Sequence, residues 1–331
     1  MNKRQAVFMA AKIVFAAAVL AWLFHKVDAS RIWAGIRDAR RTPIAAGILL
    51  CWLTLLIAGW RWQRLLAAFD IAIPLKSLLC IAQIGQFFMM FLPGPVGDDL
   101  TRMLYISRMA KARAAEACTT VLLDRLIGLT SILVLAVLCI PSQWGALSTS
   151  APAHGLALAV LASGVAVCVL GAVFFLAGHP THKWFEHCLR SLPATNFRDE
   201  LARIWGVLCV NKRRVATVLA AALVTQSLLC VVFYLGGRAV GIDVPLLTWV
   251  SFVPIVLAAN AVPITLAGLG VREYLLVLFL GIVGRVRIET ALAASFVTFS
   301  MTFVVCLFGG VVYIFFRSKK ERVGHSSVAL Q

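Results

Sequence analysis

Two stretches of this sequence combine prolines and glycines with charged residues in otherwise apolar surroundings. The first, residues 91–102, contains Asp98 and Arg102, and the second contains Arg272 and Glu273. In each stretch an arginine follows a proline by nine positions. Charged side chains inside an apolar helix are costly, so they mark candidate sites for a substrate or an ion. These residues therefore predict a site that binds a polar or anionic ligand.

The first stretch is predicted to form an elbow between two helices. Its breaks in the helix are Pro93, Gly94, Pro95 and Gly97. Asp98 or Asp99 can cap the helix that follows, and Arg102 lies four residues after Asp98 on the same helix face, so Asp98 and Arg102 can pair. The free N–H groups at such a break attract anions, as an arginine does. This favours a phosphate-binding elbow for a lipid headgroup; the alternative is a capped cytoplasmic loop with a surface ion pair.

The second stretch has a similar composition. Its breaks in the helix are Pro263, Gly268 and Gly270. Asn260 and Thr265 supply an amide and a hydroxyl that can contact a headgroup, and the glycines allow close approach of the backbone. Arg272 can bind an anionic group, and Glu273 can relay a proton or compensate the arginine. The alternative is an extracellular loop with an ordinary charge pair.

A third charged motif, Asp124-Arg125, lies inside the apolar region 119–138. Adjacent residues point to different faces of a helix, so each needs a partner from elsewhere. Arg102 is the candidate partner of Asp124, and a carboxylate or phosphate is the candidate partner of Arg125. Alternatively, both side chains snorkel to the membrane surface. The predicted headgroup-binding arginines are Arg102, Arg125 and Arg272, and the predicted charge-balancing or proton-linked acids are Asp98, Asp124 and Glu273.

No recognisable catalytic, metal or cofactor motif accompanies these charges. The sequence contains no Gly-x-Ser-x-Gly, Walker A or dinucleotide-binding pattern. His179, His182 and His187 are not spaced as ligands on one helix face, so a metal site is disfavoured. We therefore expect a protein that is not an enzyme, with no catalytic residues, no cofactor and no metal.

The composition indicates an all-α membrane protein. Of 331 residues, 61% are hydrophobic and 14% are charged, whereas a soluble domain has about 25% charged residues. The net charge of +17 comes from Lys and Arg between apolar blocks, which fits cytoplasmic loops and anionic headgroups better than nucleic acid. The nine cysteines include no Cys-x-x-Cys pair, so no disulfide framework is predicted.

Blocks of roughly 20 apolar residues predict membrane-spanning helices. The predicted spans are 6–24, 43–60, 114–140, 154–178, 214–237 and 287–316. The broken segments, 74–111 and 245–284, are each long enough for two half-length helices. The chain is predicted to form one transmembrane domain over 1–320, followed by a disordered tail at 321–331.

The distribution of Lys and Arg predicts the orientation. The loop at 141–153 has neither residue and should lie outside, whereas the basic 179–213 loop should be cytoplasmic and form interfacial helices. Both termini are then cytoplasmic, although the basic 25–42 loop must lie outside. If both broken segments are re-entrant, units of about 43–140 and 214–316 form an inverted repeat. Full crossing by both segments is the alternative, and the sequence does not separate the two.

Several of these motifs together resemble the lysylphosphatidylglycerol synthase transmembrane-region family, a group of flippase-like membrane proteins. The matching motifs are Arg61-Trp62 to Leu66, Leu92-Pro93-Gly94 with Gly97-Asp98 and Arg102, Leu123-Asp124-Arg125, and Pro263 with Gly268-Leu-Gly270-Val-Arg272-Glu273. The resemblance covers nearly the whole chain. One departure is that Gly268 stands where the second elbow would need a counterpart of Asp98.

The resemblance implies a multi-pass protein of the bacterial inner membrane that moves or helps to process a polar lipid. The aminoacylating domain of the best-known relatives has no counterpart here. The leading hypothesis is therefore a lipid translocase working without ATP on a phospholipid, a hopanoid or a polyprenyl-linked lipid. The first alternative is an accessory subunit that presents lipid to a glycosyltransferase or lipid synthase. A headgroup-modifying enzyme ranks below both.

Overall fold

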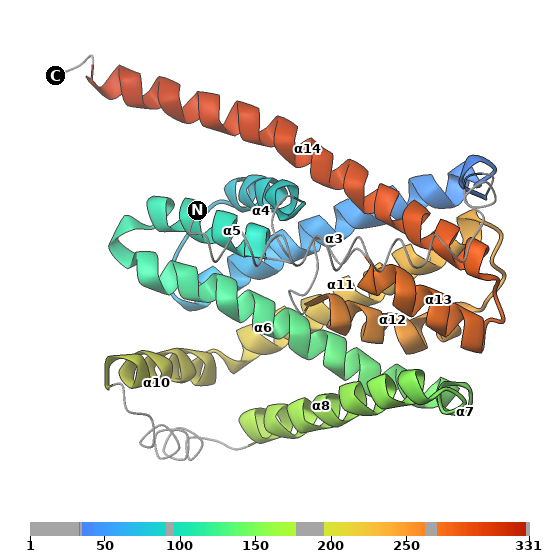
Figure 1. The fold of residues 1–331 in the computed structure, drawn as a ribbon. Coiled ribbons are helices and arrows are strands. Elements are labelled where there is room, and N and C mark those ends of the chain that lie inside the picture. The colour runs from blue at the N-terminus through green and yellow to red at the C-terminus, as the bar shows by residue number, and fades with distance from the viewer. Residues whose placement is uncertain (1–32, 34, 91–95, 177–194, 262–269, 329–331) are drawn as a thin grey trace, which may run out of the picture.

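A computed structural model describes residue 33 and residues 35–90, 96–176, 195–261 and 270–328. In 195–202 and 317–328 only the backbone is described. Every regular element in these ranges is a helix (Figure 1). The first span expected from the sequence, 6–24, lies outside the described residues.

Among the described residues, five helical segments are long and apolar enough to cross a membrane. They are α3 (Arg41–Ala68), the segment Lys111–Leu147 that contains α6 (Ala114–Cys139), α8 (Ala151–Leu176), α11 (Lys212–Ala239), and Ile288–Phe316 within α14 (Ile288–Val328). Each exceeds the roughly 20 residues needed to span the apolar layer. This confirms a polytopic helical membrane bundle.

Each broken segment consists of two short helices, as its length predicts. The first contains α4 (Leu75–Met89) and α5 (Val96–Met109), and the second contains α12 (Leu246–Ala261) and α13 (Val271–Val283). The connections between them lie outside the described residues, and so do Pro93, Gly94, Pro95, Pro263, Thr265 and Gly268. The chain thus interrupts its helices where proline and glycine are concentrated.

The two broken segments lie at opposite ends of the bundle. In Figure 1, α4 and α5 lie near the end where α3 finishes and α6 starts, whereas α12 and α13 lie near the end where α11 finishes and α14 starts. The long helices α3 and α11 pack side by side, α4 packs against α14, and α12 packs against α6. Each short pair therefore contacts a long helix from the other half of the chain.

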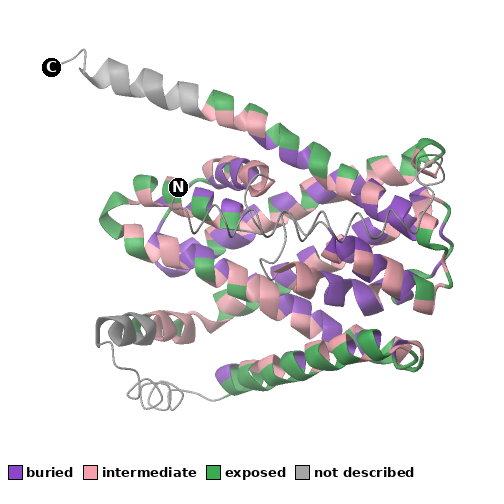
Figure 2. Cartoon of the chain, in the orientation of Figure 1, coloured by how far each residue is buried: buried purple, intermediate pink, exposed green. Residues whose placement is uncertain are grey.

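Burial separates the inner helices from the outer ones. Figure 2 shows buried residues concentrated in α12 and α13, while α8 is largely exposed. The core around α12 and α13 includes the fully buried rings of Trp249, Phe252 and Phe279. The exposed face of α8 carries large apolar side chains such as Leu158 and Leu170. In a membrane protein this face is suited to contact lipid chains.

Two helices extend beyond their predicted ends. Helix α3 continues to Ala68 rather than stopping at residue 60, because buried partners stabilise the side chains that follow residue 60. Helix α14 continues to Val328, through most of the tail for which the sequence predicts disorder. Glu321 and Arg322 at the start of that part are good helix formers, and composition alone does not reveal this continuation. Within the basic 179–213 loop, α10 (Thr195–Val210) is helical as expected.

The contact between α4 and α14 depends on Gly309, which leads to a first prediction. A Cβ atom at Gly309 would lie 2.1 Å from the backbone oxygen of Gln83. Because backbone atoms cannot move aside cheaply, Gly309→Ala is expected to lower the free energy of unfolding by about 1–3 kcal/mol. Gly171 in α8 has open space around it, so Gly171→Ala should be neutral or slightly stabilising. Unfolding of both variants in detergent checks this, and equal stabilities would contradict it.

Candidate functional site

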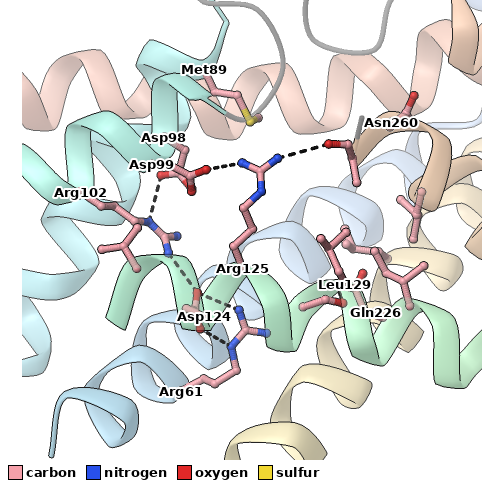
Figure 3. Close-up of a pocket in the computed structure, with 16 residues that line it drawn as sticks. Arg61, Met89, Asp98, Asp99, Arg102, Asp124, Arg125, Leu129, Gln226 and Asn260 are labelled. Carbon is pink, nitrogen blue, oxygen red and sulfur yellow. Dashed lines mark hydrogen bonds and ion pairs between the residues drawn. The ribbon is translucent and has the colours of Figure 1, made fainter. Parts of the chain in front are cut away.

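A cavity of about 420 Å³ lies between the first broken segment, α6 and the end of α12 (Figure 3). Its charged lining residues are Arg61, Asp98, Asp99, Arg102, Asp124 and Arg125. Its uncharged lining residues are Met89, Val121, Gly128, Leu129, Ile132, Gln226, Leu229, Leu257, Asn260 and Ala261. The cavity therefore joins a strongly charged side to an apolar side.

Helix α6 supplies one continuous face of this cavity. The lining residues on α6 recur at intervals of three and four along the helix, which is the spacing of one helix face. They begin with Val121, continue through Asp124 and Arg125, and end at Ile132. The adjacent acid and base lie on neighbouring edges of this face, so both border the cavity while binding different partners.

Asp124 is a buried carboxylate shared by two arginines from other helices. Arg61 of α3 donates from Nε and Nη2 to its two oxygens, over 2.7 and 3.0 Å. Arg102 of α5 donates from Nη1 to Asp124 Oδ2 over 3.2 Å, so this pair predicted from the sequence is present. The Asp124 side chain is 4% exposed. Bidentate charge-assisted bonds of this kind fix the geometry of three helices at one point.

Arg102 also holds the start of α5 in place. Its Nε donates to Asp98 Oδ1 over 3.0 Å, which is the expected pair one helical turn apart. The guanidinium lies 5.2 Å above the ring of Trp62, and Trp62 Nε1 donates to the hydroxyl of Thr120 over 3.1 Å. Gly97 is buried one residue before Asp98. These contacts therefore hold the charged side of the cavity in a fixed geometry.

Arg125 connects the two broken segments. Its Nη1 donates to the carboxylate of Asp99 in α5, and its Nη2 donates to the backbone oxygen of Ala261 over 3.2 Å. Ala261 is the last residue of α12. The predicted carboxylate partner of Arg125 thus exists, and Figure 3 shows the guanidinium reaching across the cavity. A substitution of Arg125 therefore removes contacts to both broken segments.

A second buried charge cluster lies at the start of α13, away from the cavity lining. Glu273 is completely buried and accepts hydrogen bonds from Arg272, from Ser295 Oγ over 3.1 Å and from the Gly270 N–H over 2.6 Å. Gly270 has φ +89°, which other residues rarely adopt. Arg272 also lies 4.8 Å above the ring of Phe299. This cluster fixes the second elbow against α14.

The sequence matches the family described as the lysylphosphatidylglycerol synthase TM region over residues 9–310. The chain belongs to this family. The match includes both broken segments and every charged residue of the two clusters. No curated protein shows significant similarity to the chain.

The fold of this lysylphosphatidylglycerol synthase TM-region protein divides the predicted site residues into two groups. Those that line the cavity are Arg102, Arg125, Asn260, Asp98 and Asp124. Arg272 and Glu273 belong to the second cluster, and are not among the residues that line the cavity. The three predicted headgroup arginines therefore do not converge on one point.

Three further lining residues of this family member were missed as site residues by reasoning from the sequence. Arg61 follows the predicted end of its helix, yet it is 7% exposed and binds Asp124. Asp99 is predicted from the sequence only as a helix cap, although it pairs with Arg125. Gln226 is a lone amide within the apolar block 214–237. A polar side chain in an apolar block is itself a signal of a site, and this signal was present at Gln226.

Proposed function

We propose that this protein moves a polar lipid between the two leaflets of its membrane, with the headgroup entering the cavity between the two broken segments. The observation that carries this proposal is the two-sided lining of the cavity. Its charged side is formed by α3, α5 and α6, and its apolar side includes Leu129, Leu229 and Leu257. An amphiphile presents the same combination of polar and apolar surface, and pockets of this size are typical of ligand sites.

The packing of the helices supports an inverted repeat as the basis of movement. Each helix of the first unit has a counterpart in the second: α3 corresponds to α11, α4 to α12, α5 to α13 and α6 to α14. When every helix is replaced by its counterpart, each contact between two of these helices corresponds to a contact that is also present. For example, the α4–α14 contact becomes the α12–α6 contact, and the α3–α11 contact becomes itself. In transporters with inverted repeats, the substrate lies near the midplane where broken helices meet. Re-entrant segments entering from opposite faces would open the cavity to each leaflet in turn.

In this mechanism the cavity arginines have different tasks. Arg125 bridges Asp99 and Ala261, so it keeps the two segments aligned around the headgroup as it passes. Arg102 supports the polar side through Asp98 and Asp124. Arg272 and Glu273 hold the second elbow in shape as it moves.

The proposal is tested by leaflet exchange of fluorescent lipids in vesicles that contain the purified protein. Several lipid classes are compared, with protein-free vesicles as the reference. Exchange above that reference for at least one class supports the proposal. Exchange equal to that reference for every class would overturn it.

Arg125→Gln is expected to slow leaflet exchange by about tenfold to a hundredfold, because charge-assisted hydrogen bonds to both segments are lost. Arg125→Lys keeps the charge but lacks the planar pair of donors, so its exchange rate should lie between those of Arg125→Gln and the wild type. Arg238→Gln is the matched control, since Arg238 pairs with the exposed Asp243 outside the cavity lining. Thermal unfolding confirms that each variant is folded, and wild-type rates in folded Arg125→Gln would contradict the role of Arg125.

A further inference from the structure

The charges around the cavity cancel one another. Its lining contains three arginines and three aspartates, and each guanidinium is bonded to at least one of the carboxylates. The pairs are Arg61 with Asp124, Arg102 with Asp98 and Asp124, and Arg125 with Asp99. An anionic headgroup would have to displace a carboxylate from its arginine, and a cationic headgroup would have to displace an arginine. Both exchanges leave a buried charge uncompensated, which is costly.

Two uncharged acceptors on the cavity lining remain unused. Asn260 Oδ1 and Gln226 Oε1 are buried, and neither accepts a hydrogen bond from the described residues. A buried acceptor without a donor costs free energy, which a bound ligand can recover. The Gln226 Nε2 group lies 3.5 Å from the Gly128 backbone oxygen, at the long end of the hydrogen-bond range. The lining is therefore suited to a ligand that carries hydrogen-bond donors.

The donors that fit are hydroxyl groups rather than ammonium groups. An ammonium carries a full charge into the cavity and needs a free carboxylate, and all three lining carboxylates are engaged. A hydroxyl carries no charge and can donate to an amide oxygen at ordinary cost. The apolar lining residues Leu129 and Leu257 can cover the carbon faces of a sugar ring or the first carbons of an acyl chain.

We infer that the cavity selects lipids with an uncharged, hydroxyl-rich headgroup, such as a glycosyl-diacylglycerol, and that Asn260 and Gln226 accept hydrogen bonds from its hydroxyls. This inference rests on the proposed function, because it names the substrate class of the same cavity. It assigns the two amides as specificity residues and the paired charges as the rigid frame that holds them.

The test measures binding separately from movement. The full-length protein in detergent is titrated with monoglucosyl-diacylglycerol, diacylglycerol, phosphatidylglycerol, phosphatidylethanolamine and phosphatidylcholine, and bound lipid is counted by native mass spectrometry. Monoglucosyl-diacylglycerol is expected to bind at least about tenfold more tightly than diacylglycerol, since two hydrogen bonds to buried acceptors are gained. Gln226→Met and Asn260→Leu should each weaken glucolipid binding by roughly threefold to tenfold while leaving diacylglycerol binding unchanged.

Gln143→Met is the control substitution, because Gln143 lies outside the cavity lining. Tighter binding of phosphatidylglycerol or phosphatidylethanolamine than of the glucolipid would overturn the inference, as would unchanged glucolipid binding in both folded amide variants. Vesicle exchange of the same lipids separates the two proposals. Glucolipid preference without exchange of any lipid would refute translocation and keep the headgroup assignment. Exchange led by a charged lipid or by phosphatidylcholine would refute the headgroup assignment and keep translocation.

Discussion

Asp124→Ala is expected to destabilise the protein by about 3–5 kcal/mol, the cost of removing one partner of a buried ion pair. The carboxylate compensates Arg61 by two hydrogen bonds and Arg102 by one. Without it, Arg61 is left buried with no acidic partner among the described residues. Arg102 keeps Asp98, so most of the loss comes from Arg61. Reversible unfolding in mixed micelles measures this change.

Two companion variants make the Asp124 prediction specific. In Arg61→Met with Asp124→Leu, both partners are replaced by apolar groups, and at least half of the lost stability should return. Asp243→Asn is the matched control, because this aspartate also pairs with an arginine but its side chain is 91% exposed. Exposed pairs contribute little, so its unfolding midpoint should not move. A double variant no more stable than Asp124→Ala would contradict the assignment of the loss to uncompensated charge.

Glu273→Gln is expected to cost a similar amount, about 3–5 kcal/mol, although the two side chains have nearly the same shape. The amide is uncharged, so Arg272 stays buried beside Ser295 and the Phe299 ring without a counter-charge. It also cannot accept from Arg272, Ser295 and the Gly270 N–H as strongly as a carboxylate does. The unfolding free energy of the variant is measured in the same micelles.

The control for this substitution is Glu289→Gln. Glu289 pairs with Arg287 over 3.5 Å, and the Arg287 side chain is 68% exposed. A loss below about 1 kcal/mol is expected there. If both substitutions gave the same small loss of unfolding free energy, the buried cluster at the second elbow would not stabilise the fold as its burial indicates.

Much of the architecture was predictable because its signals are local. Apolar blocks of spanning length, and the prolines and glycines that divide 74–111 and 245–284, follow from physical constraints on backbone in a membrane. The Asp98–Arg102 pair follows from helical spacing. The Arg102–Asp124 pair was predictable for a different reason: a buried charge needs a partner, and few were available.

The rest of the site depends on tertiary packing that a single sequence does not encode locally. Arg61 and Gln226 line the cavity only because α3 and α11 approach α6 at those positions. Arg272 resembles Arg102 in its spacing from a proline, yet it packs against Phe299 of α14. Similar local patterns therefore led to different surroundings, and only the arrangement of the helices separates a cavity residue from a supporting one.

The pairing of Arg61 with Asp124 has a consequence for how the protein enters its membrane during synthesis. The two residues are 63 positions apart, so the ribosome releases the arginine well before its acidic partner. A single arginine costs roughly 2.5–3.5 kcal/mol to insert at the middle of a helix, and less toward a helix end, where Arg61 lies in α3. Helix α3 therefore carries Arg61 without this acidic partner until α6 has been synthesised. The buried Arg61–Asp124 pair can therefore form only after both helices are present, so the final packing of α3 depends on α6.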